Sequence, residues 1–150
     1  MPGTNAVYTF KKSGPEGQDQ HLYDNCDAYP SGAASKLLVA YEQSQVQLAR
    51  RSQPTTSAML HSLAVGDIPD SYEQLMLTSD WRNGPSTNFR YEIEERAGDV
   101  HVAVLCPDLS GRTDSFKLPP GQNFLNWSCE FSGVLREFAD WAREHDGLEA

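Results

Sequence analysis

Cysteine is scarce in this chain of 150 residues, and its three cysteines, Cys26, Cys106 and Cys129, include no C-x-x-C pair. An odd number of thiols without paired spacing argues against a disulfide framework and favours free thiols in a reducing compartment. No apolar run approaches the roughly 18 residues of a membrane span, and the first residues lack the pattern of a secretory signal. We therefore expect a cytoplasmic protein with no membrane partner.

Basic residues are also few, since the chain has 12 Lys and Arg and 21 Asp and Glu, which gives a formal net charge of −9. Non-specific binding to nucleic acid or to an anionic membrane depends on a basic surface, so this composition argues against both. An acidic surface is compatible with a basic or nucleic-acid-binding protein partner. It is equally compatible with charge that serves solubility alone.

The chain lacks the common cofactor and hydrolase motifs, since no G-x-G-x-x-G, P-loop, G-x-S-x-G or H-E-x-x-H occurs. We expect no cofactor. Two His–Cys pairs share one spacing, His21 with Cys26 and His101 with Cys106. Residues five apart on a strand point to opposite faces, so the second pair cannot ligate one ion without a bulge, and known zinc spacings differ. We expect no metal site.

What the chain does contain is a series of periodic segments typical of an α+β domain. Strand-like alternation occurs in residues 6–11, 21–23, 72–81, 89–94, 100–106 and within 115–131, and helical periodicity occurs in residues 31–51, 58–65 and 133–146. Pro30 is placed to start the first helix, while Ser132 and Gly147 are placed to bound the last. We predict one α+β domain over residues 1–150, with an antiparallel sheet of five or six strands and three helices mainly on one face, in the order ββααβ-ββ-(β)β-α.

Cys26 and the carboxylates beside it permit an enzymatic interpretation. Cys26 is near His21 in the sequence and precedes a helix N-terminus, an arrangement that can activate a thiol. The flanking Asp24 and Asp27 would instead raise the pKa of that thiol. Their three-residue spacing in a polar loop predicts that both are exposed, which does not suit shared acid–base catalysis. A small enzyme using the Cys26/Asp27 region therefore stays an alternative.

The segment TSDWRNGPSTNF carries a candidate interface anchor. Trp81 and Arg82 stand together in a predicted loop with Asp80 before them. Tryptophan and arginine are enriched among the residues that dominate binding at protein interfaces. The alternative is that Trp81 only covers the edge of the core.

Three stretches, HLYDNCDAYPSGAASKL, GDIPDSYEQLMLTSDWRNG with NFRYEI, and FSGVLREFADW, resemble the motif order of a group of small, largely uncharacterised bacterial and prophage-encoded proteins. That group has a Y-x-H-x-D-G-Y-P segment before its first helix, and the resemblance spans about Tyr8 to Trp141. The matching positions are Tyr23, Asp27, Tyr29 and Pro30. Asn25 stands where the group has His, and Ala28 where it has Gly, which further weakens a case for acid–base chemistry. The resemblance implies a phage-associated or accessory protein and supplies no activity.

The sequence as a whole favours a non-enzymatic, acidic protein-binding module of phage, prophage or accessory type. Its sharpest form is an inhibitor of a host defence complex, similar to anti-CRISPR proteins. The expected binding residues are Asp27, Tyr29, Asp80, Trp81 and Arg82. The alternatives are the small enzyme and a DNA mimic, which requires carboxylates spaced along one face.

Overall fold

In a computed structural model of the chain, the structure describes residues 5–14, 16–24, 29–48, 55–64, 76–78, 87–107 and 127–147. The strands are β1 (Ala6–Phe10), β2 (Gln20–Asp24), β3 (Met76–Thr78), β4 (Phe89–Arg96), β5 (Asp99–Pro107) and β6 (Trp127–Val134), and the helices are α1 (Pro30–Leu48), α2 (Thr55–Ala64) and α3 (Leu135–Gly147). The expected α+β class is confirmed.

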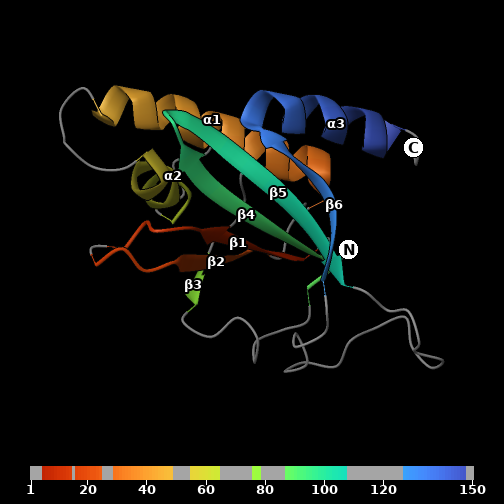
Figure 1. The fold of residues 1–150 in the computed structure, drawn as a ribbon, viewed down its shortest axis with the longest axis horizontal. Helices are drawn as coiled ribbons and strands as arrows, with labels where there is room; N and C mark the ends of the chain where they lie inside the picture. Colours follow the sequence, from red (N-terminus) through yellow and green to blue (C-terminus); the bar gives the residue numbers. More distant parts are fainter. Residues whose placement is uncertain are drawn as a thin grey trace.

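The strands form one mixed sheet in the order β3-β2-β1-β4-β5-β6 (Figure 1). Four neighbouring pairs are antiparallel, but β1 and β4 run parallel, with Tyr8 beside Tyr91. The expectation of an antiparallel sheet is therefore wrong at this pair. The sequence patterns of hairpins identify only strand pairs that are close in the sequence. Parallel neighbours such as β1 and β4 are joined instead by a long crossover, which here includes α1 and α2.

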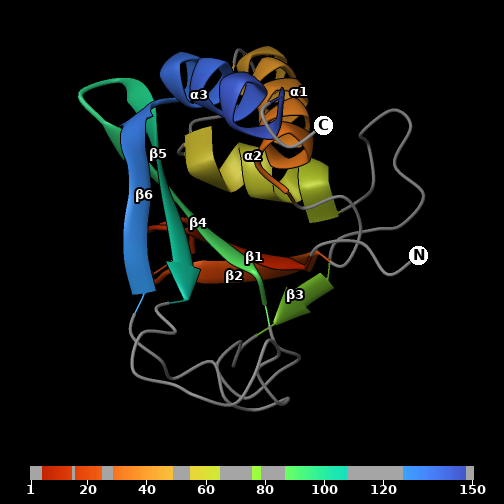
Figure 2. The ribbon, with the colours of Figure 1, turned by 90° about the vertical axis from the view of Figure 1, so that its right-hand side faces the viewer.

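The three helices of the described residues all lie on one face of the twisted sheet (Figure 2). Helix α3 packs on β5 and β6, α2 packs on β4 and β1, and α1 packs against the other two helices. The largest buried side chains lie between these two layers: Tyr8, Phe10, Leu22, Leu37, Met59, Leu63, Tyr91, Ile93, Val102, Val104 and Phe138. This burial explains the apolar face of each element, because an apolar side chain gains about 1.5–3 kcal/mol on leaving water.

The β4–β5 hairpin shows how alternation and turn chemistry agree. Tyr91 and Ile93 are buried, while Arg90 and Glu92, which alternate with them along β4, are half-buried. The strands are joined by Ala97 and Gly98, which both have positive φ, 51° and 86°. This two-residue turn twists in the same sense as the strands, and glycine adopts its second position without steric cost.

Helices α1 and α3 begin in different ways. At α1 the carbonyl oxygen of Tyr29 accepts the N–H of Ala33 at 2.9 Å, and Pro30 occupies the first turn, where its missing N–H costs nothing. At α3 the expected start after Ser132 is wrong, because β6 continues to Val134. The Glu137 carboxylate then accepts the N–H of Val134 at 3.2 Å, as in a capping box.

Candidate functional site

Most of the binding residues expected from the sequence lie outside the described residues. This applies to Asp27, Asp80, Trp81 and Arg82, and also to Cys26. Tyr29 is described, and its side chain is 39% exposed at the start of α1. Tyr29 is therefore accessible to a partner, and its binding role stays a prediction.

The junction between β2 and α1 is organised by a buried carboxylate. Asp24, the last residue of β2, is only 1% exposed. Its Oδ2 atom accepts the hydroxyl of Tyr8 at 2.8 Å and the Nζ ammonium of Lys36 at 2.7 Å. The expectation that Asp24 is exposed is wrong, because it pairs opposite the buried residue Ala6 and turns toward α1. No local sequence signal joins these three residues, which come from β1, β2 and α1.

This cluster is suited to holding the fold rather than to meeting a substrate. A carboxylate that is 1% exposed cannot contact a molecule in solution. Burial, and then the charge of Asp24, raises the pKa of Tyr8 well above its ordinary value, so the phenol remains a donor. The Lys36 ammonium meanwhile links α1 to the sheet beneath it. Asp24, Tyr8 and Lys36 thus position the segment that carries Tyr29.

The opposite face of the sheet carries a polar network. The buried hydroxyl of Thr9 lies 2.9 Å from Nδ1 of His21 and 3.5 Å from Nε of Arg90. The carboxylate of Glu92 lies 3.1 Å from Arg90 and 3.9 Å from Lys11. Glu92 is neutralised by these bases, and Glu94 on the same strand lies 2.6 Å from Arg96. The described part of this face is therefore not the unpaired row of carboxylates that DNA mimicry requires.

The described thiols, Cys106 on β5 and Cys129 on β6, differ in their surroundings. Cys106 is half-buried and Cys129 is exposed. Burial, and then the charge of Glu130, raises the pKa of Cys106 from 9.0 to about 11. Neutral thiols are poor nucleophiles, so Cys106 is not placed for catalysis near neutral pH.

We expect Cys129 to be alkylated by iodoacetamide about tenfold or more faster than Cys106 near neutral pH, because Cys129 is exposed, whereas burial shields Cys106 and raises its pKa. Peptide mass spectrometry over time measures both rates, with Cys106→Ala assigning the slow adduct. Between pH 9.0 and about 11 the unfolded thiol ionises before the folded one, so this group makes the folded state less stable as the pH rises. Equal alkylation rates would contradict this placement.

The His101–Cys106 pair is separated as the spacing indicates. On β5 the buried residues Val100, Val102 and Val104 share the helix face with the position of Cys106, and His101 lies on the other. Among the described residues, no group of three or more His, Cys, Asp or Glu side chains is arranged to hold a metal ion. None of the described helices has the length and apolarity needed to cross a membrane.

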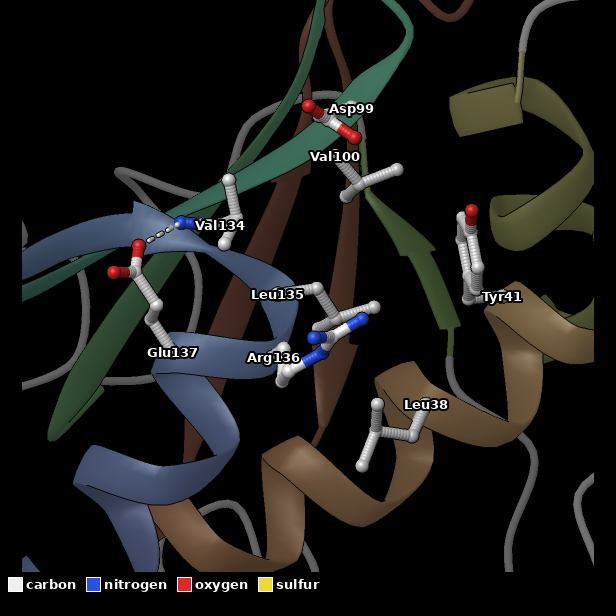
Figure 3. Close-up of a pocket in the computed structure, with 8 residues that line it drawn as sticks. All are labelled: Leu38, Tyr41, Asp99, Val100, Val134, Leu135, Arg136 and Glu137. Atoms are coloured by element: carbon white, nitrogen blue, oxygen red, sulfur yellow. Dashed lines mark hydrogen bonds between the residues drawn. The ribbon is translucent and has the colours of Figure 1, made fainter.

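A hollow of about 550 Å³ opens between α1, α3 and the start of β5 (Figure 3). It is lined by Leu38, Tyr41, Asp99, Val100, Val134, Leu135, Arg136 and Glu137. Leu38 is 37% exposed, although most large apolar side chains of the described residues are buried. The Arg136 side chain extends from α3 into the space toward α1, whereas Glu137 is turned to its contact with Val134 (Figure 3).

Sequence reasoning missed this hollow, because its walls come from segments about a hundred positions apart. The one available signal is the Leu37–Leu38 pair on a single helix, since successive helical residues point about 100° apart and a narrow apolar face buries only one of them. Leu37 is fully buried, and Leu38 is left at the surface. No family model, curated protein or solved structure matches the chain.

Proposed function

We propose that this protein is a non-enzymatic protein-binding module of phage, prophage or accessory type, and that the hollow between α1 and α3 holds an apolar side chain of its partner. The observation that carries the proposal is the exposed Leu38 in the wall of a hollow of about 550 Å³. Leu135 and Val134 line the same space. An aliphatic or aromatic anchor placed there would bury its own surface together with that of Leu38.

The arrangement of the lining supports a protein interface. Interfaces combine an apolar centre with a polar rim, and a few anchors that fill pockets supply most of the binding energy. Here the apolar wall is bordered by Asp99 and Arg136, which are both exposed. Burying an anchor the size of leucine or phenylalanine contributes about 1.5–3 kcal/mol.

The overall charge of the chain favours a basic protein as the partner. The chain carries a formal net charge of −9, and Asp99 at the rim makes no ion pair with another described residue. A positively charged partner, such as a nucleic-acid-binding subunit of a host defence complex, would be attracted over a Debye length of about 8 Å at physiological salt. The protein then acts as an inhibitor by occupying that subunit, without binding nucleic acid itself.

The test is a pair of charge-matched substitutions in the full chain. Leu38→Glu places a carboxylate in the apolar wall, so we expect affinity for a partner purified from bacterial lysate to fall about tenfold or more. The control is His61→Glu, an exposed residue on α2 outside the hollow, which should leave affinity unchanged. Isothermal titration calorimetry measures both, and circular dichroism confirms the fold. Equal affinity of folded Leu38→Glu and wild-type protein would remove the hollow from the interface.

Two competing functions have weaker support. The small enzyme depends on Cys26 and Asp27, so it requires Cys26 to be alkylated much faster than Cys106 and Cys129 near neutral pH. The DNA mimic requires unpaired acids, whereas Glu92 and Glu94 lie within salt-bridge distance of Lys or Arg. A partner held equally well in low and high salt would argue against mimicry.

A further inference from the structure

The two edges of the sheet differ greatly in length. Strand β3 at one edge has three residues, whereas β6 at the other has eight (Figures 1 and 2). Beyond its pairing with β5, β6 faces no other described strand. An edge strand presents a row of N–H and C=O groups that can pair with another extended chain. Strand β6 therefore offers the longer template for strand addition.

The side chains of β6 leave this edge accessible. Ser128, Cys129, Glu130 and Ser132 are all exposed. Natural edge strands are commonly protected by charged residues, proline, bulges or very short length, and the sequence WSCEFSGV has eight residues with no lysine or proline but with one acid and one bulge. Its one charged residue is Glu130. The register between β5 and β6 shifts here, because Val104 pairs with Phe131 but Leu105 pairs with Cys129, which leaves Glu130 without a partner on β5.

An aromatic platform lies beside the edge on its helix side. Phe131 of β6 stacks on Trp141 of α3 with ring centroids 5.3 Å apart, and His145 stacks on Trp141 at 4.8 Å. All three side chains are partly exposed. Because alternate residues of a strand point to the same face, a strand added to β6 would project apolar side chains over these rings.

Charge selects the kind of strand that fits. Glu130 makes no ion pair with another described residue, and the chain has a formal net charge of −9. A basic side chain opposite Glu130 would form a stabilising cross-strand pair of opposite charge. A second copy of this acidic chain would instead bring like charges together. The charge therefore favours a basic partner over self-association.

We propose that the edge of β6 that faces no other described strand binds an extended, basic segment of a partner protein by strand addition. The segment carries a lysine or arginine opposite Glu130 and an apolar residue over Phe131 and Trp141. Main-chain hydrogen bonds to β6 supply affinity, and these two contacts supply specificity. The surface is distinct from the hollow, because Glu130, Phe131 and Trp141 do not line it.

The test titrates the ¹⁵N-labelled full chain with a synthetic peptide of alternating Val and Lys and follows it by NMR. We expect chemical-shift changes at residues 127–134 and at the Trp141 indole, together with slowed amide exchange along β6. The same peptide with a central proline should lose this binding, because proline cannot donate to the ladder. Shift changes away from β6, or none at saturating peptide, would overturn the proposal.

Charge reversal makes the test specific. Glu130→Lys should weaken binding of the Val–Lys peptide about tenfold or more and favour a matched Val–Glu peptide, whereas Glu16→Lys, exposed in the β1–β2 connection, should change neither. Leu38→Glu should bind the peptide as wild type does, so failure at the hollow and failure at β6 are separate results. If sedimentation equilibrium shows a dimer in the absence of peptide, and the β6 amides are protected from exchange in that dimer, the edge binds a second copy and the proposal is overturned.

Discussion

Replacing Asp24 with Ala is expected to lower the free energy of unfolding by about 3–5 kcal/mol, because it leaves a charged partner uncompensated. The Lys36 ammonium lies 2.7 Å from Asp24, and its side chain is only 13% exposed. The buried Tyr8 hydroxyl loses its acceptor in the same change. Urea denaturation followed by tryptophan fluorescence measures the loss as a lower midpoint at an unchanged slope.

Two further variants distinguish the effect of breaking the buried ion pair from the effect of simply losing a side chain. The double variant Asp24→Leu with Lys36→Met removes both charges, so we expect it to be less destabilised than Asp24→Ala alone. Asp140→Ala breaks an ion pair with Arg143 in which both side chains are more than 60% exposed, and it should cost less than about 1 kcal/mol. If Asp24→Ala cost no more than Asp140→Ala, the buried pair would have no structural role.

Phe138→Ala should have the second large effect, a loss of about 3–5 kcal/mol, because it opens a cavity in the centre of the core. Phe138 is fully buried, and its ring lies 5.8 Å from Tyr91, 6.2 Å from Phe131 and 6.4 Å from Trp141. These rings connect α3 to β4 and β6. Thermal or urea unfolding measures the loss, and near-ultraviolet circular dichroism should show weaker signals from the neighbouring aromatic residues.

Two substitutions on the same helix calibrate this result. Glu144 is exposed on α3, so Glu144→Ala should change the free energy of unfolding by less than about 0.5 kcal/mol. Phe138→Leu retains much of the buried volume, so it should cost less than Phe138→Ala. A Phe138→Ala protein as stable as Glu144→Ala would show that α3 does not depend on this contact.

The contacts of Asp24 and of Phe138 each support one of the two helices, α1 and α3, that form the walls of the hollow. The Asp24–Lys36 pair ties α1 to the sheet, and Phe138 ties α3 to it. Leu38 and Arg136 project from those same helices into the hollow. Substitutions at Asp24 and Phe138 thus test the packing of α1 and α3 on the sheet, whereas Leu38→Glu and Glu130→Lys test the two proposed binding surfaces.

Local sequence patterns predicted those helices and strands whose structure depends on only a few neighbouring residues. The alternation of β4 and β5 around the Ala97–Gly98 turn is one case, because side-chain period and turn chemistry act on adjacent residues. The start of α1 at Pro30 is another, since proline restricts its own φ and the residue before it. The end of β6 was misplaced because Ser132 is compatible with both a strand and a helix cap.

The α+β class, the β1–β2 and β4–β5 hairpins and the acidic character follow from local patterns, because they depend on neighbouring residues or on composition. Three other features depend on long-range packing: β1 lies parallel to β4, Asp24 is buried against Tyr8 and Lys36, and Leu38 borders a hollow. Each of these features joins segments far apart in the chain. Their positions are set by which apolar faces pack together, and no local pattern encodes that choice.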